Sequence, residues 1–172
     1  MKASVTELVT ERLFLRPVDS GDLEPLQAIW SDSLVMRHMG ADTRDAAQSL
    51  KRLQELIEHQ RRHGFGKWVA IERATGALIG YCGIELYDGG PDFELGFCFA
   101  RSAWGRGYAT EAARAWLKHG FGALGFPRVI AVVKPANTAS IRVLEKVGMT
   151  KAGPIQLAGS DWLLYETRSP TR

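Results

Sequence analysis

The segment AWGRGYATEAARAWLKHGF, residues 103 to 121, has the residue types of an anion-binding turn. Gly105 and Gly107 flank Arg106, and an alanine-rich run that favours a helix follows at once. The first N–H groups of a helix have no partner within it, and the helix dipole adds about half a positive charge there. Glycines permit positive φ and the close approach of a ligand. The spacing therefore predicts a phosphate or pyrophosphate site, although a tight strand-to-helix turn can also require glycines for its conformation alone.

Two common nucleotide motifs do not fit this turn. The sequence contains no G-x-x-x-x-G-K-S/T string, which a P-loop requires. The dinucleotide fingerprint G-x-G-x-x-G would need a glycine at position 110, which is Thr110. Neither a nucleoside triphosphate nor NAD is favoured.

Glu94 is the best candidate for a general base. In FELGFCF, residues 93 to 99, strand alternation places the phenylalanines and Leu95 on one face and Glu94, Gly96 and Cys98 on the other. A carboxylate beside a glycine packs poorly in a central strand, so this face is expected to meet a cleft. The alternative is a structural carboxylate that bonds a neighbouring strand or helix end.

The histidines and cysteines do not indicate a metal site. His59 and His63 share a helix face, but the string HQRRH lacks the glutamate of H-E-x-x-H, which favours a solvated basic face. Cys82 and Cys98 have neither disulfide-framework nor metal-ligand spacing and are expected to be buried thiols. No metal is predicted.

The hydrophobic periodicity predicts a mixed fold. Three strands joined by short turns form an antiparallel meander, and an alternation of helices and strands follows. We expect an α/β (α+β) fold with a single mixed, mostly antiparallel sheet of about seven strands flanked by about four helices, and one domain over residues 1–172. The expected strands are 10–18, 67–73, 77–87, 93–100, 128–133, 150–156 and 161–168, and the expected helices are 20–35, 43–64, 110–124 and 137–148.

The composition is that of an ordinary globular protein. Hydrophobic residues make up 45% and charged residues 24% of the 172 residues, and the net charge is +3. The Lys and Arg residues are scattered, so a nucleic-acid partner is not expected. No apolar stretch is long enough for a membrane span and no targeting segment is visible, so we expect a cytoplasmic protein.

The segments FELGFCFARSAWGRGYATEAARAWLKHGF and LGFPRVIAVVKPANTASIRVLEKVGM resemble the acetyl-CoA-binding core of the GNAT superfamily of N-acetyltransferases. The chain is most similar to the RimJ/RimL-like branch, and TERLFLRPV resembles the opening strand of that branch. The pyrophosphate loop of the superfamily has the pattern Q/R-x-x-G-x-G/A. Here Trp104 stands at its first position, which is typical of this branch and leaves the backbone donors in place.

The resemblance implies a set of cofactor contacts. The end of the strand before the turn would lie beside the pantetheine arm of acetyl-CoA, the turn would hold the pyrophosphate, and the next helix would contact the pantetheine arm and the sulfur. The residues so implied are Cys98, Phe99, Trp104, Gly105, Arg106, Gly107, Tyr108, Ala109, Thr110, Asn137 and Ser140.

The resemblance also assigns catalytic roles. A glutamate at the position of Glu94 often serves as base, directly or through water, and Ser140 corresponds to a proposed acid near the sulfur. Many relatives have a tyrosine acid where this chain has Leu144, and a glutamate ahead of the last strand is absent, with Asp161 shortly after that place. Asn137 and Asp161 have simpler interpretations as a helix N-cap and a turn residue.

The expected reaction is direct transfer of an acetyl group to a primary amine, on a protein N-terminus or on a small molecule. Trp30, Met36 and His38 lie in the region where this family forms its acceptor pocket, or they form a hydrophobic contact at a helix end. Homodimers are common in this branch. The alternative is a catalytically silent acyl-CoA-binding module, which would share the glycine turn without needing a base.

Overall fold

The computed structural model describes residues 6–170 and places eight strands in one sheet. The order across the sheet is β1-β2-β3-β4-β5-β6-β8-β7, and every neighbouring pair is antiparallel except β5 and β6. The single mixed, mostly antiparallel sheet is confirmed. The two-residue β1 is an addition to the expected strands. The strands are β1 (Leu8–Val9), β2 (Leu13–Pro17), β3 (Lys67–Glu72), β4 (Leu78–Leu86), β5 (Phe93–Phe99), β6 (Arg128–Val133), β7 (Thr150–Leu157) and β8 (Ser160–Arg168).

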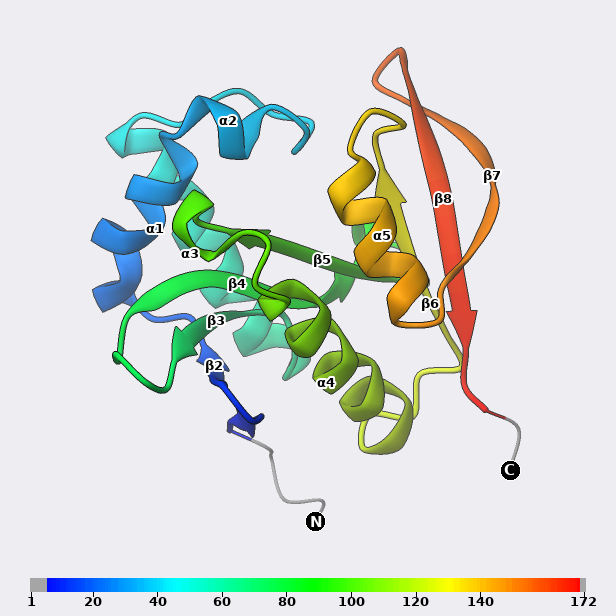
Figure 1. The fold of residues 1–172 in the computed structure, drawn as a ribbon, viewed down its shortest axis with the longest axis horizontal. Helices are drawn as coiled ribbons and strands as arrows, with labels where there is room; N and C mark the ends of the chain where they lie inside the picture. The colour runs from blue at the N-terminus through cyan, green and yellow to red at the C-terminus, as the bar shows by residue number, and fades with distance from the viewer. Residues whose placement is uncertain (1–5, 171–172) are drawn as a thin grey trace.

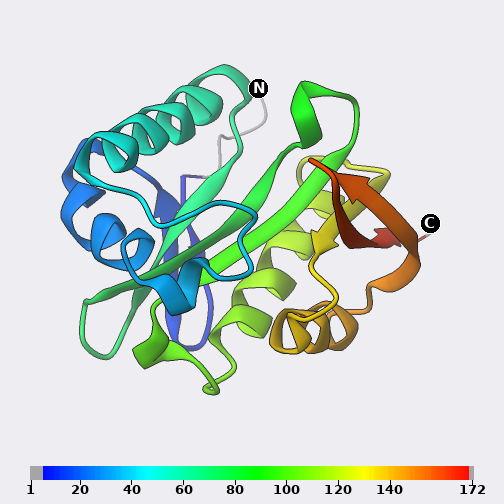
Figure 2. The ribbon, with the colours of Figure 1, turned by 90° about the horizontal axis from the view of Figure 1, so that it is seen from above.

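Helices cover both faces of the sheet (Figures 1 and 2). α1 and α3 lie on one face, and α4 and α5 lie on the other. None of the helices within residues 6–170 has both the length and the apolar character needed to cross a membrane. The helices are α1 (Leu23–Trp30), α2 (Ser33–Met36), α3 (Ala46–His63), α4 (Tyr108–Gly122) and α5 (Thr138–Lys146).

The helix expected over residues 20–35 is interrupted. A 3-10 turn, Ser20–Asp22, precedes α1, and the chain leaves the helix at Asp32 before α2 begins. The Asp32 carboxylate accepts a hydrogen bond from the backbone N–H of Leu34 at 3.0 Å, so it caps α2. It also receives Arg101 Nε at 2.5 Å, which ties this break to the segment that follows β5. The expectation of one continuous helix is therefore wrong at Asp32.

α3 begins and ends where its sequence predicts. Asp45 and Gln48 form a capping box, with reciprocal bonds of 2.8 and 2.9 Å between side chain and backbone. Gly64 ends the helix at a φ of 75°, which a residue with a side chain adopts only at a cost. These two ends hold α3 across one face of the sheet.

The apolar residues form two clusters, one on each face of the sheet. The first includes Trp68, Leu95 and Trp116 and packs α4 and α5 against the sheet. The second includes Trp30, Leu53 and Cys98 and packs α1 and α3 against the opposite face. β5 contributes to both, because alternate residues of a strand point to opposite faces.

The sheet divides between β5 and β6. These strands pair only at Glu94 and Ile130, and from there they diverge (Figure 1). The part of β5 that runs toward Phe99 therefore has a backbone edge that β6 does not cover. Such an edge can pair with an extended polar ligand.

Candidate active site

The glycine turn between β5 and α4 has the geometry of an anion site. Gly105 and Gly107 have φ values of 71° and 81°, in the left-handed region. The backbone N–H groups of residues 105 to 110 donate to no other atom of the described chain. They lie at the N-terminus of a 15-residue helix, where the dipole favours negative charge. Free N–H groups and a helix N-terminus are what the prediction of a phosphate site requires.

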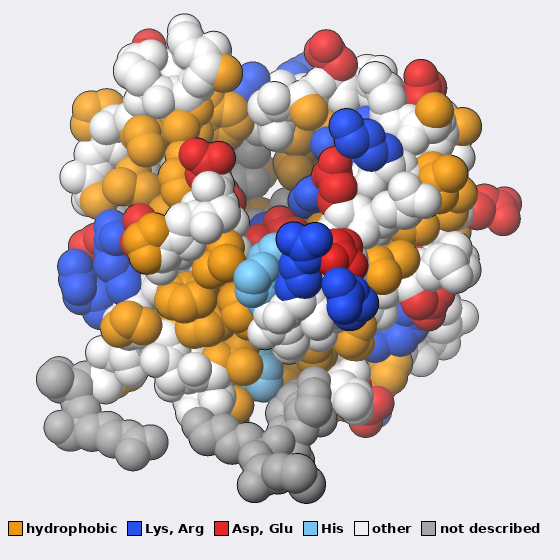
Figure 3. Space-filling model, turned by 180° about the vertical axis from the view of Figure 1, so that it is seen from behind, with side chains coloured by type: hydrophobic (Ala, Val, Ile, Leu, Met, Phe, Trp, Pro, Cys, Tyr) orange, Lys and Arg blue, Asp and Glu red, His pale blue; other side chains and the backbone are white. Residues whose placement is uncertain are grey.

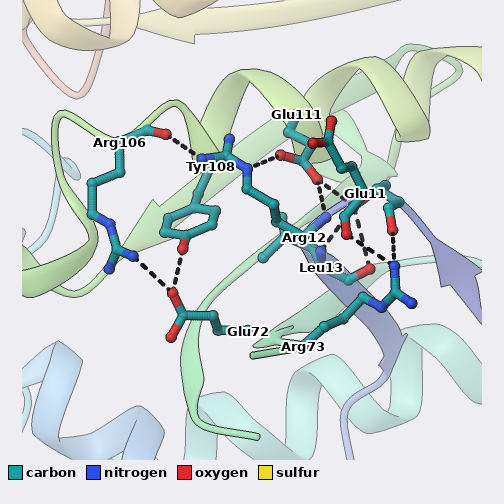
Figure 4. Close-up of polar contacts among 9 residues, drawn as sticks. Glu11, Arg12, Leu13, Glu72, Arg73, Arg106, Tyr108 and Glu111 are labelled. Atoms are coloured by element: carbon teal, nitrogen blue, oxygen red, sulfur yellow. Dashed lines mark hydrogen bonds and ion pairs between the residues drawn. The ribbon is translucent and has the colours of Figure 1, made fainter. Parts of the chain in front are cut away.

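A network of polar side chains connects the turn to the residues at the start of β2 (Figure 4). Arg12 Nε pairs with Glu111 Oε2 at 2.7 Å, and Arg12 Nη1 donates to the carbonyl of Arg106 at 2.7 Å. Glu111 also accepts from Thr10 Oγ1 at 2.6 Å and from the Arg12 backbone N–H at 2.8 Å. Arg12 therefore connects the start of β2 to the turn and to the first turn of α4.

The Arg106 side chain is turned toward β3. Its Nη2 lies 3.0 Å from Glu72 Oε1, and its guanidinium lies 4.8 Å from the centre of the Tyr108 ring. Tyr108 donates to the same carboxylate, and the hydrogen bonds from Tyr108 and Thr75 lower the pKa of Glu72. The positive charge stays at the rim of the turn, since the Arg106 side chain is 53% exposed. An anion at this turn would therefore meet free N–H groups, whereas the Arg106 guanidinium is already paired with Glu72.

Trp104 has a structural contact that its sequence position did not reveal. Its indole Nε1 donates to the carbonyl of Phe99 at 2.8 Å, so it fastens the turn to the end of β5. The ring itself is 50% exposed. A tryptophan at this position therefore fixes the turn without using any of its backbone donors.

Asn137 and Ser140 open α5 as a cap and its first turn. Asn137 Oδ1 accepts from the Ser140 backbone N–H at 3.2 Å, so the N-cap role is present. Gly148 follows the helix at a φ of 86°, as its C′ position requires. Both Asn137 and Ser140 line a cavity, so capping does not remove them from the site.

This cavity has a volume of about 330 Å³ and reaches both sides of the division between β5 and β6. Its walls come from β4, β5, β6, Lys67 on β3, the start of α5, α3 and the loop before α3, and Trp162 on β8. Figure 3, which views the molecule from behind, shows a hollow in the upper middle, with charged side chains of both signs nearby. Three residues thus face one space: the expected base Glu94, the expected acid Ser140 and the N-cap Asn137.

Glu94 lies in this cavity opposite Glu85, its antiparallel partner on β4. Glu94 forms no hydrogen bond or ion pair within residues 6–170, whereas Glu85 lies 3.5 Å from Lys67 Nζ and 3.3 Å from Arg52 Nη2. Burial raises the pKa of Glu94 and the positive charge of Lys67 partly opposes this, with Glu85 adding to the rise. Burial would also raise the pKa of Glu85, but Lys67, Arg52 and His59 together lower it. The two carboxylates therefore differ in basicity, and Glu94 has the raised pKa that suits a general base near neutral pH.

Gly96 leaves room for Lys67. A Cβ at Gly96 would lie 2.4 Å from Lys67 Nζ, so the lysine passes over the glycine to reach Glu85. The Lys67 side chain is only 8% exposed. The glycine beside Glu94 is thus explained by a buried cation as well as by the cavity.

The three residues expected in the acceptor pocket separate into two groups. His38 lines the cavity. Trp30 and Met36 are buried in the core beside α1 and α3, and Trp30 Nε1 donates to the Tyr81 hydroxyl at 3.4 Å. They have the hydrophobic role that the sequence allowed as the alternative.

The remaining candidates have structural contacts. Cys98 is buried in the core, which raises its pKa to about 12, so its backbone and not its thiol faces the division of the sheet. Asp161 is exposed and bonds Gln156 across the β7–β8 hairpin. His59 Nδ1 lies 2.9 Å from the Phe65 carbonyl, and its Nε2 accepts from the Leu86 N–H at 3.2 Å. No cluster that could hold a metal occurs within residues 6–170.

Most of the charged wall of the cavity was not predicted from the sequence. Glu85 could have been found by counting back across the DGGPD turn, since the register places it opposite Glu94. Arg44 and Arg52 have no local signal, because they reach the cavity only when α3 and its preceding loop pack beside the sheet. Lys67 lies on β3 and reaches the cavity by crossing Gly96 of β5, which becomes visible only when the strand order is known. Trp162 lies against Gly40 on the other side, where an added Cβ would come within 2.9 Å of its ring.

The sequence matches a family model and is similar to several known proteins. Residues 12–150 match the family model of the acetyltransferase (GNAT) domain. The chain is 35% identical over 167 residues to the uncharacterized protein YkkB of Bacillus subtilis (strain 168), covering 95% of this chain and 96% of that protein. It is 32% identical over 148 residues to the uncharacterized N-acetyltransferase p20 of Bacillus licheniformis, covering 85% and 83%.

Solved structures have the same fold. The acetyltransferase (GNAT family) from Bacillus anthracis has a TM-score of 0.84 at 28% identity and covers 95% of this chain and 98% of its own. RimL, a ribosomal alpha-N-protein acetyltransferase in complex with coenzyme A, has a TM-score of 0.80 at 16% identity and covers 93% and 96%. The second likeness concerns the fold alone.

Proposed function

Because this chain belongs to the GNAT acetyltransferase family, we propose that it moves an acetyl group from acetyl-CoA directly to a primary amine, and that residues 1–172 act as one catalytic domain. The observation that carries this proposal is the cavity of about 330 Å³ in which Glu94, Ser140 and Asn137 face the division between β5 and β6. The acceptor is a peptide N-terminus or a small-molecule amine.

The residues present fit the cosubstrate. The free N–H groups of residues 105 to 110 would hold the pyrophosphate, and the uncovered edge of β5 near Cys98 and Phe99 would pair with the amides of the pantetheine arm. Asn137 and Ser140 then lie beside the path to the cavity. Acetyl-CoA supplies the thioester whose carbonyl carbon the amine attacks.

Glu94 has the role of base. Its carboxylate would receive the proton that the amine must lose, directly or through a water, as the new C–N bond forms. The raised pKa brings its titration toward neutral pH, where a base accepts protons most effectively. An α-amine with a pKa near 8 needs only about 1.4 kcal/mol to lose its proton at pH 7, against about 4.6 kcal/mol for a lysine, so a modest base suffices for an N-terminus.

Ser140 is the proposed proton donor to the departing thiolate. It lines the cavity on the first turn of α5, and the aliphatic Leu144 one turn later has no proton to give. As the C–S bond breaks, the hydroxyl of Ser140 or a water would protonate the sulfur. Proximity within the cavity supplies much of the rate, as in other direct transfers.

Thiol release from acetyl-CoA across a panel of amines tests this function. The panel contains N-terminal peptides, lysine peptides, polyamines and aminoglycosides, and isothermal titration with coenzyme A uses the same preparation. Amine-dependent thiol release supports the proposal. Tight coenzyme A binding without turnover on any amine would favour a silent acyl-CoA-binding module, and no binding would refute the assignment of the glycine turn. Sedimentation of the same preparation tests the homodimer that is common in this branch.

A further inference from the structure

Arg44 occupies a junction between two cavities. A second hollow, also of about 330 Å³, adjoins the first and shares Arg44, Arg52 and Glu55 with it. Lys51 and Gln48 of α3 contribute to its wall. A molecule that enters the space in front of Glu94 from this side therefore passes along Arg44 and Arg52.

The fixed charges of the first cavity are paired, with two exceptions. Arg52 contacts Glu85 and Glu55 at 3.3 Å each, and Lys67 contacts Glu85 at 3.5 Å. Glu94 and Arg44 have no ion-pair partner within residues 6–170. The cavity thus presents one unpaired carboxylate beside the site of transfer and one unpaired guanidinium at its other side.

The position of Arg44 is fixed by the protein. Its backbone N–H donates to the carbonyl of Trp30 at 2.9 Å, and its guanidinium lies 5.5 Å from the centre of the Trp30 ring. The side chain is half-buried and packs on a core residue, so it loses little freedom when an anion binds. A guanidinium held in this way is suited to a planar carboxylate, which it can bind with two parallel hydrogen bonds.

This inference rests on the proposed function: we propose that the acceptor carries a carboxylate on the same molecule as its amine, and that Arg44 binds this carboxylate while Glu94 receives the amine. Such an acceptor complements both unpaired charges at once. A polyamine would meet the unpaired Arg44 with a charge of the same sign, and it would find only one free carboxylate. The acceptor class is therefore an amino acid, or a peptide whose first residues carry an acidic side chain.

Matched acceptors separate these possibilities. The pairs are leucine with leucinamide, and an aspartyl-alanine amide with an asparaginyl-alanine amide, with spermidine as the polycation. Each is assayed by thiol release with the wild type, Arg44→Gln, Arg44→Lys and the control Arg61→Gln. Arg61 lies at the exposed end of α3 and pairs with Glu58, away from both cavities. Coenzyme A affinity by titration reports that each variant is folded.

The proposal predicts that the wild type prefers the carboxylate-bearing member of at least one pair by about tenfold or more in kcat/KM. Arg44→Gln should lower this value by about 10- to 100-fold for that acceptor, because a hydrogen bond to a charged group is lost. Arg44→Lys should restore part of it, and Arg61→Gln should leave it unchanged. The pair that shows the preference tells whether the carboxylate is the α-carboxylate or a side chain.

Two results would overturn this inference while leaving the proposed function intact. One is that the wild type turns over the member without the carboxylate equally well or better in both pairs, or turns over spermidine better than either carboxylate-bearing acceptor. The other is a loss in Arg44→Gln that is the same for charged and neutral acceptors. Absence of turnover with every amine, with coenzyme A still bound, would instead contradict the proposed function itself.

Discussion

Replacing Gly105 with alanine tests the anion-binding turn with little other disturbance. Gly105 has a φ of 71°, and a Cβ added there would meet no atom within 4 Å. The substitution therefore introduces no clash, and its only direct cost is the left-handed backbone of an alanine, about 1–2 kcal/mol. For a chain of this size we expect the melting temperature to fall by about 2–8 °C.

The effect on ligand binding should be larger than this strain suggests. The methyl group would stand in the open space next to the free N–H groups of the turn, and relaxation of φ would turn those groups away from a bound phosphate. Loss of one hydrogen bond to a charged group is worth about 1.5–3 kcal/mol, so coenzyme A should bind about 10- to 100-fold more weakly.

Gly64→Ala is the matched control. Gly64 has a φ of 75°, a Cβ there also meets nothing within 4 Å, and it ends α3 outside the turn. Both variants should lose similar stability in thermal unfolding, but only Gly105→Ala should lose affinity in isothermal titration with coenzyme A. Wild-type affinity in Gly105→Ala, or an equal loss in Gly64→Ala, would refute the pyrophosphate role of the turn.

Three further changes have defined outcomes. Arg12→Ala removes the contacts to Glu111 and to the Arg106 carbonyl, and should weaken coenzyme A binding about 5- to 10-fold in titration, whereas the exposed Arg114→Ala should not. Lys67→Met removes a positive charge that opposes the pKa rise of Glu94, so the acid limb of the kcat/KM profile for a given amine should move to higher pH, and Lys67→Arg should leave it in place. An unmoved limb in the methionine variant would contradict this. Because folding raises the pKa of Glu94, ionisation of this carboxylate lowers the stability of the folded protein as pH rises. Glu94→Gln should therefore melt a few degrees higher than the wild type at pH 7, and at the same temperature near pH 4. Equal melting temperatures at pH 7 would count against a buried ionised Glu94.

The elements were predictable where local chemistry specifies them. Asp45 and Gly64 mark both ends of α3, and the alternation in FELGFCF places Glu94 and Leu95 on opposite faces, as observed. The break at Asp32 was not predictable from local pattern. The Asp32 carboxylate caps α2 and pairs with Arg101, a residue distant in the sequence, and this contact exists only in the folded chain.

The cavity was only partly predictable for a related reason. Glu94 and Ser140 could be named from strand alternation and from the family resemblance. Trp30 and Met36 could not be assigned to the core or to the cavity, because a short helix reveals its buried face only once its partners are known. Arg44 reaches the cavity through the packing of the loop before α3 beside the sheet, and Lys67 reaches it from β3 by crossing Gly96 of β5, so neither has a local signal.

The proposed function requires that an amine accepts an acetyl group in the cavity with Glu94 as its base. The most direct measurement is amine-dependent thiol release from acetyl-CoA by the wild type, Glu94→Gln and the exposed control Glu58→Gln, with coenzyme A affinity measured in parallel. We expect Glu94→Gln to lower kcat by about 100-fold at unchanged coenzyme A affinity, and Glu58→Gln to behave as the wild type. Full turnover by Glu94→Gln, or thiol release that does not depend on an amine, would contradict it.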